Sequence, residues 1–404
     1  MKKNYLIYII IIIILVAVLG SLIFLIAQDN SNKMANFQGM EKSSNSDKTN
    51  ATEVSGNIYS STDVFTNRDL EQTADLTDAT NYTLASGEDI HITEEGVYVL
   101  TGTATNSTVY VEAQDTDKVQ IVLDGVSITN DDFPCIYAKT ADKVFITTTD
   151  TENTLVVANA FTTDGDVNTD GVIFSKSDIT LNGTGSLNIE STDNGIVGKD
   201  DLKITGGTYN ITATSKTIEA NDSIAIADGI FNLKAGTDGL HSENSDDDSV
   251  GYIFITGGEF TINAGDDGIH GQSVVQIDGG SITITAAEGI EGTYIQINGG
   301  TITINASDDG INAADKSSSY FTVVEINDGD ITITMGAGDT DGVDANGDII
   351  INGGTISVTG NSTFDYDGEA QLNGGTVIVN GSEVDELPNQ MMGGPQGGNN
   401  KQNR

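Results

Sequence analysis

Carboxylate side chains recur through the second half of this sequence in a short phrase that continues with glycine and an aliphatic residue. The phrase is repeated at 237–240, 266–269, 287–290, 308–311 and 340–343. Two copies double the acid, and the copy between them brings two glutamates. The acids best spaced to share a cation are Asp266, Asp267, Glu288, Glu291, Asp308, Asp309, Asp341 and Asp344.

Calcium is the cation that this set predicts, because Ca²⁺ binds several carboxylate, carbonyl and water oxygens at once. Asp-Gly is also ordinary turn chemistry, and a single copy is explained by a turn alone. The doubled acids need a further explanation, since Ser or Asn would make the same turn without repulsion between carboxylates. We therefore predict a calcium site from these residues. The spacing of an EF-hand loop is not matched.

A second repeated phrase indicates how these acids are positioned. An aliphatic residue, a polar residue and Gly-Gly recur about every 20 to 29 residues, for example at 277–280 and 297–300. Each copy precedes a strand in which Ile alternates with Thr, such as Ser281–Thr285. This alternation is typical of a half-buried strand, and one coil can bury its Ile face only if neighbouring coils stack on it. The sequence thus predicts an all-β fold, a parallel β-helix (solenoid), over residues 61–384.

Stacked coils would bring equivalent positions to about 4.8 Å from one another. Acids that are one period apart would then become neighbours. His241 and His270 also occupy the same place in successive copies of the acidic phrase. Two stacked imidazoles could bind a transition metal, but no third His is near in sequence, so simple stacking of the rings is the favoured interpretation. His91, in an early alternating strand, is interpreted as structural.

The N-terminus is predicted to be a membrane anchor. Tyr5 to Ala27 form an uncharged apolar run, long enough for a helix to cross a bilayer and longer than a typical signal-peptide core. Lys2 and Lys3 would keep residues 1–4 in the cytoplasm, which makes a single-pass protein of the cell membrane with its C-terminal domain extracellular. Residues 28–60 are predicted to be a flexible linker, and 385–404 a disordered Gly/Asn/Gln tail.

The charge balance excludes one class of partner. The chain has 60 Asp and Glu against 17 Lys and Arg, a formal net charge of -43. Such a surface repels nucleic acid and attracts divalent cations. A single cysteine, Cys135, excludes an intrachain disulfide framework and a zinc site built from cysteines.

Several segments resemble a family of clostridial cell-surface proteins described as carbohydrate-binding domain-containing. The resemblance covers about residues 86–381, and the segments that carry it are 92–103, 117–126, 173–183 and 198–207. The resemblance implies a right-handed parallel β-helix, similar to that of pectate lyases. It also implies binding of calcium, cellulose and acidic, pectin-like polymers.

An enzyme is the less favoured alternative. A calcium-dependent polysaccharide lyase needs a Lys or Arg base beside the metal. The repeats contain no Arg, and Lys316 is the only Lys between 235 and 400, although Lys199, Lys203 and Lys216 remain candidates. Sugar rings stack on aromatic side chains, and the aromatic candidates, which could equally pack in the core, are Tyr252, Tyr294, Tyr320 and Phe321.

The sequence therefore predicts non-catalytic, extracellular binding of an acidic pectin-like or cellulosic polysaccharide, dependent on Ca²⁺. A calcium-dependent polysaccharide lyase and a structural or adhesive cell-envelope protein remain as alternatives, because a fold alone does not give a function.

Overall fold

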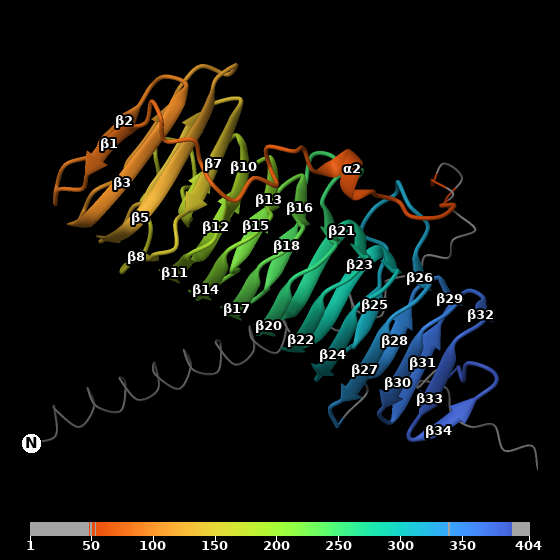
Figure 1. Ribbon diagram of the computed structural model, residues 1–404. Coiled ribbons are helices and arrows are strands. Elements are labelled where there is room, and N and C mark those ends of the chain that lie inside the picture. The colour runs from red at the N-terminus through yellow and green to blue at the C-terminus, as the bar shows by residue number, and fades with distance from the viewer. Residues whose placement is uncertain (1–47, 49–50, 53, 338–339, 390–404) are drawn as a thin grey trace, which may run out of the picture. The chain divides into compact units, whose positions relative to one another are not determined.

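The computed structural model describes residues 48, 51–52, 54–337 and 340–389. These residues belong to one compact unit, 44–404, in which short strands are stacked coil upon coil (Figure 1). Among the described strands every pairing is parallel except that of β33 with β34. The predicted all-β parallel solenoid is confirmed, while the right-handed sense of its coil stays a prediction.

Each full coil contributes a strand to three faces, which we name A, B and C. Face A consists of β2 (Ile90–Ile92), β4 (Val109–Glu112), β6 (Ile136–Thr140), β9 (Gly171–Ser175), β12 (Asn194–Gly198), β15 (Ile218–Ala220), β18 (Leu240–Ser242), the first parts of β21 (Asp267–Ile277) and β23 (Glu288–Ile297), β25 (Ile311–Ala313), β28 (Asp341–Ala345) and β31 (Ser362–Tyr366).

Face B consists of β1 (Thr80–Thr83), the first parts of β3 (Gly96–Thr105) and β5 (Lys118–Asn130), β7 (Lys143–Thr148), β10 (Asp178–Gly183), β13 (Asp201–Ile204), β16 (Ser223–Ile226), β19 (Tyr252–Ile255), the second parts of β21 and β23, β26 (Val323–Ile326), β29 (Asp348–Ile351) and β32 (Ala370–Leu372). Face C consists of the second parts of β3 and β5, β8 (Glu152–Val157), β11 (Ser186–Ser191), β14 (Thr208–Ala213), β17 (Ile230–Ala235), β20 (Glu259–Asn263), β22 (Ser281–Ala286), β24 (Thr301–Ala306), β27 (Asp330–Met335), β30 (Thr355–Thr359) and β33 (Thr376–Val379), with β34 (Ser382–Val384) at its end.

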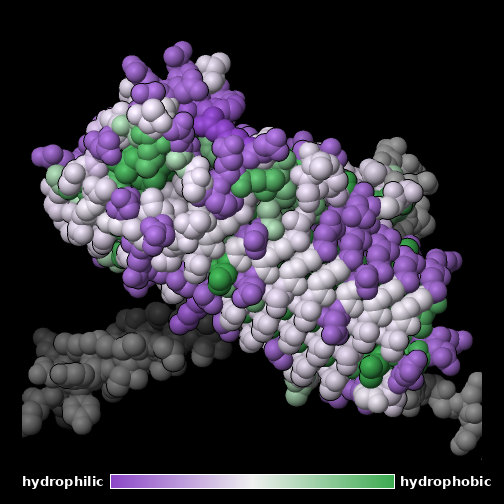
Figure 2. Space-filling view, in the orientation of Figure 1, coloured by the Kyte–Doolittle hydropathy of each residue, from purple (hydrophilic) through white to green (hydrophobic). Residues whose placement is uncertain are grey.

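The core is built from ladders of aliphatic side chains. On face C the strand register pairs Ile262 with Ile284, then Ile304 and then Ile333, and all four are at most 1% exposed. The threonines between them point outward, so the surface over β20, β22 and β24 is pale and weakly polar in Figure 2. The Ile/Thr alternation thus sets which side of each strand is buried.

The Gly-Gly phrase forms the corner between faces B and C. The second glycine of each pair takes a positive φ, which is 104° at Gly258, 101° at Gly280 and 97° at Gly300. A side chain is disfavoured in that conformation. Asparagine amides beside the corner bond from coil to coil, with Asn327 donating to Asn298 at 2.8 Å and Asn352 donating to Asn327 at 2.7 Å. The glycines and the asparagine ladder together turn the chain from face B to face C.

An N-terminal segment, residues 54–72, packs along face B and includes the short helix α2 (Ser61–Val64). In Figure 1 it is the red-to-orange chain beside β13 and β16. The Tyr59 amide donates to Gln276 Oε1 at 2.7 Å, and Lys203 Nζ donates to the Val64 carbonyl at 2.7 Å. Residues 54–60 were expected to end a flexible linker, but in the structure they contribute apolar side chains to a packed cluster.

Large parts of both chain ends lie outside the described residues. The predicted anchor, 5–27, lies outside the described residues, as do the start of the linker and positions 390–404 of the predicted tail. Within the described part of the chain, no helix has the length and apolar character needed to cross a bilayer. Leu387 is 8% exposed and joins the main core, so the packed region extends past residue 384.

Candidate functional site

Ionisable side chains gather on the outer surface of face A in two parallel rows. The acid row contains Asp238, Asp267, Glu288, Asp309 and Asp341. The mixed row lies three residues further along each coil and contains Glu219, His241, His270, Glu291, Asn312, Asp344 and Asp365. Six of the eight predicted metal ligands are in these rows. Asp266 and Asp308 are solvent-exposed and stand one residue before the acid row.

The glycine that follows each acid allows the adjacent coil to approach closely, and it is not needed to form a turn. A Cβ on Gly268 would lie 2.6 Å from the Gly289 carbonyl oxygen and 2.4 Å from Ile284 Cγ2. A Cβ on Gly289 would lie 2.3 Å from the Gly310 oxygen. Positive φ is not required at either position, and strands β21 and β23 begin at the acid itself. The interpretation of Asp-Gly as a simple turn is therefore wrong here: the glycine makes room for the adjacent coil.

His270 neutralises two of the acids. Its Nδ1 lies 2.8 Å from Asp267 Oδ2 and 2.7 Å from Glu291 Oε2. Burial by itself would lower the pKa of His270. The hydrogen bonds to Asp267 and Glu291 outweigh burial and raise this pKa to about 10. Lys316 Nζ lies 2.9 Å from Glu291 Oε1. Although burial of Glu291 acts in the opposite sense, the hydrogen bond from His270 and the charges of His270 and Lys316 lower its pKa.

Glu288 and Asp309 have no such compensation. Burial, together with the charges of Glu291, Asp267 and Asp309, raises the pKa of Glu288 to about 8, even though Asn312 Nδ2 donates to Glu288 Oε2 at 2.9 Å. Burial and the adjacent acids also raise the pKa of Asp309 to about 6. Among the described residues, no Lys, Arg or His forms an ion pair with either carboxylate. This part of the acid row is therefore where a cation would relieve the most repulsion.

An orphaned oxygen atom beside these two acids fits the chemistry of calcium. Asn312 Oδ1 is buried without a hydrogen-bond partner among the described residues. A buried oxygen without a donor is costly unless water or an ion satisfies it. Glu288 lies on one coil, and Asp309 and Asn312 lie on the next. Together they offer carboxylate and amide oxygens, which are the ligands that Ca²⁺ takes. The residues present thus fit the ion.

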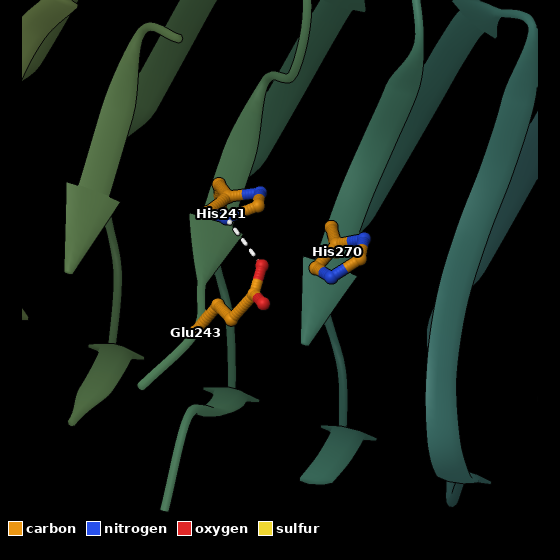
Figure 3. Close-up of side chains that lie close together, drawn as sticks. All are labelled: His241, Glu243 and His270. Carbon is orange, nitrogen blue, oxygen red and sulfur yellow. Dashed lines mark ion pairs between the residues drawn. The ribbon is translucent and has the colours of Figure 1, made fainter. Parts of the chain in front are cut away.

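The histidine pair lies at one end of the site. The His241 and His270 rings stack with centroids 4.6 Å apart and planes at 17°, as predicted. His241 Nδ1 lies 2.9 Å from Asp238 Oδ2, a close contact without the alignment of a hydrogen bond. Its Nε2 lies 3.4 Å from Glu243 Oε2 (Figure 3). His91 is far along the same face, where it bonds Glu112 at 2.8 Å.

Comparison with known proteins shows the family of the chain. A model of the family described as "Carbohydrate-binding domain-containing protein" matches residues 86–339 and 288–385. The chain belongs to this family. A protein of that description from Acetivibrio thermocellus is 38% identical over 131 residues, which are 31% of this chain and 45% of that protein. The chain therefore matches less than half of that relative's length.

A solved structure shows a weaker likeness to this chain. It is described as the polysaccharide lyase-like protein from C. thermocellum, in a gadolinium derivative. It is 23% identical, covers 73% of this chain and 99% of its own, and superposes with a TM-score of 0.40.

The aromatic side chains that were candidates either for sugar contact or for core packing lie in a packed cluster with the N-terminal segment. Tyr252 stacks on Tyr59 of the N-terminal segment at 4.1 Å. Tyr294 is 5% exposed and donates a hydrogen bond to Glu325, while Tyr320 and Phe321 pack in the same cluster. These rings form the surface on which the N-terminal segment packs. They do not make the open platform that a sugar ring needs.

The lysines that were candidate lyase bases are also engaged. The negative charge of Glu291 outweighs burial and raises the pKa of Lys316, whereas a base needs a lowered one. Lys199 and Lys216 both pair with Glu219, at 3.4 and 3.5 Å, and Lys203 lies under the N-terminal segment. Sequence reasoning missed Asn312 and Glu219 as members of the site. Their position in the coil was the signal that could have found them, because Glu219 is in register with His241 and Asn312 is in register with Glu291.

Proposed function

We propose that this protein binds polysaccharide at face A without cleaving it, and that Ca²⁺ joins the acid row to an acidic, pectin-like polymer. Membership of a carbohydrate-binding family supports the polysaccharide. The proposal of a calcium ion rests on the stacking of Glu288 and Asp309. These are two partly buried carboxylates that form no ion pair with a positive side chain among the described residues. The family assignment does not depend on that observation.

Calcium would be held by Glu288 and Asp309 with the amide oxygen of Asn312, next to Asp341. The ion would supply positive charge to a surface that is otherwise strongly negative, since the chain's formal net charge is -43. Without it, an acidic polymer would be repelled. Asp267 and Glu291 are already neutralised by His270 and Lys316, so they contribute less to the calcium site.

Binding without cleavage is favoured over lyase activity by the state of the nearby lysines. Lys316 is the lysine closest to the calcium ligands, and its contact with Glu291 stabilises its protonated form. A protonated lysine cannot remove a proton from the polymer. We place the protein in the cell membrane, anchored by 5–27 with this face outside the cell, on the basis of that apolar run.

Co-sedimentation of the full chain with polygalacturonate gel tests the proposal. Binding in Ca²⁺ should be lost with a chelator and weakened at least tenfold by Glu288→Gln or Asp309→Asn. Asp330→Asn makes the same charge change on exposed face C and should have no effect. Equal binding with and without the chelator would contradict the proposed calcium bridge. Failure to bind polygalacturonate or cellulose would leave a structural role, and release of unsaturated uronate would show a lyase.

A further inference from the structure

We propose that His241, His270 and Glu243 form a binding site for Zn²⁺ or a similar late first-row divalent metal, distinct from the calcium ligands. The site lies on face A where β18 and β21 are adjacent, with Glu243 directly after β18 (Figure 3). It rests on the juxtaposition of two imidazoles and a carboxylate. Polysaccharide binding is not required for it.

The three side chains already stand close to one another. One ligand atom from each lies within 4.8 Å of the others. His241 and His270 are paired in register, which holds their rings stacked at 4.6 Å. Zinc bonds nitrogen at about 2.0–2.1 Å, so the nitrogens must approach by roughly 1 Å when the ion enters. Exposed Glu243 can follow, because its side chain is 50% exposed.

Carboxylates on the opposite edge of each ring leave Nε2 as the atom for the metal. His270 Nδ1 is hydrogen-bonded to Asp267 at 2.8 Å, and His241 Nδ1 lies 2.9 Å from Asp238. The Asp267 carboxylate accepts a hydrogen bond from His270 Nδ1 and keeps a proton there, so a metal ion that binds His270 takes the place of the second proton of the ring, on Nε2. The Asp238 carboxylate lies on the same edge of the His241 ring. Metal-bound histidines regularly have such a carboxylate behind them, which orients the ring and increases its basicity. Here each histidine has such a carboxylate on the aspartate three residues before it in the sequence.

The donor set selects the kind of ion. Imidazole nitrogen suits zinc, copper and nickel, whereas calcium takes oxygen. Three protein ligands leave one position of a tetrahedral zinc open for water or for an oxygen of a bound molecule. The two rings are 9% and 6% exposed, so the site is sheltered, and Glu243 marks the side from which an ion enters. Asp238, Asp267 and Glu291 around the rings offset the charge of the ion.

Metal binding to the full chain tests this site. Equilibrium dialysis against Zn²⁺ in excess Ca²⁺ should give one Zn²⁺ per chain, and the protein loaded with Co²⁺ should show visible absorption typical of nitrogen ligands. His241→Gln and His270→Gln should each weaken Zn²⁺ binding at least tenfold. His91→Gln is the matched control, because His91 lies on the same face without a second histidine, and it should bind as the wild type does.

Glu243→Gln keeps the test valid if a histidine variant unfolds, because this exposed position lies outside the strands. It should weaken Zn²⁺ binding several-fold and leave the circular dichroism spectrum unchanged. No zinc bound at micromolar concentration would overturn the proposal. It would also be overturned if Asp309→Asn removed the zinc while His241→Gln did not, since the ion would then occupy the acid row.

Discussion

Oδ1 of Asp69 lies 2.6 Å from Nζ of Lys143, and this contact fastens the N-terminal segment to β7. The Asp69 side chain is completely buried, and Thr180 Oγ1 also donates to it at 3.0 Å. Burial by itself would raise the pKa of Asp69, but the hydrogen bonds from Lys143 and Thr66 lower it below the usual value. The segment is therefore held by a buried ion pair whose members are both satisfied.

Asp69→Ala should destabilise the protein by about 3–5 kcal/mol, because it leaves Lys143 buried without its partner. A lowered carboxyl pKa stabilises the fold above the unfolded pKa of about 4, and this contribution is lost as the pH falls further. The difference between variant and wild type, measured by urea unfolding, should thus shrink in acid. Exposed Asp78→Ala is the control and should change stability by less than about 0.5 kcal/mol.

Calcium should raise the melting temperature of the full chain, because an ion that binds only the folded state stabilises it. At about 100 times its dissociation constant the gain is about 2.7 kcal/mol. A chelator should reverse the gain, and Glu288→Gln should reduce it, while Asp330→Asn should retain it. Scanning calorimetry gives the answer directly. The same melting temperature with and without calcium would rule out an ion in the acid row.

Gly289→Ala tests whether the glycines of face A are there for close packing. The new methyl group would lie 2.3 Å from the Gly310 oxygen and 2.6 Å from Ile304 Cγ2, so the coils must separate. We expect a loss of about 2–3 kcal/mol in chemical unfolding and weaker calcium binding. Gly336→Ala is the matched control, since its methyl group would meet nothing nearer than 3.3 Å. An equal loss in both variants would contradict this role.

The contribution of Asp178 to stability should depend on pH in the opposite sense to that of Asp69. Burial and the charges of Asp201 and Asp200 raise its pKa to about 6. The folded state thus holds this proton more tightly than the unfolded state, and stability falls as the pH rises from about 4 through 6. Asp178→Asn should therefore be more stable above pH 6, by about 1 kcal/mol once solvent screening is allowed for.

That variant and the wild type should have the same stability below about pH 4, where both side chains are neutral. Melting temperatures measured from pH 4 to pH 8 provide the comparison. Curves that stay parallel over the whole range would show that Asp178 does not titrate in this way.

The acid row illustrates what a repeat pattern can and cannot give. The register of Asp267 with Glu288 follows from the sequence, because each coil begins at the same phrase and parallel strands keep that register. The sequence does not indicate which acids have a positively charged partner. Asp267 is neutralised by His270 on its own coil. Glu291 pairs with Lys316, which comes from an insertion whose path no periodic pattern describes.

The sequence by itself determined the stacked parallel coils, their Ile core and the rows of acids on one face. These features repeat, and strand alternation with glycine corners is a local property of the chain. The tertiary structure alone decided that Tyr252 and Tyr294 lie under the N-terminal segment and that Lys316 pairs with Glu291. Such contacts join segments with no common period, so they depend on how non-repeating residues fill the surface left by the coils.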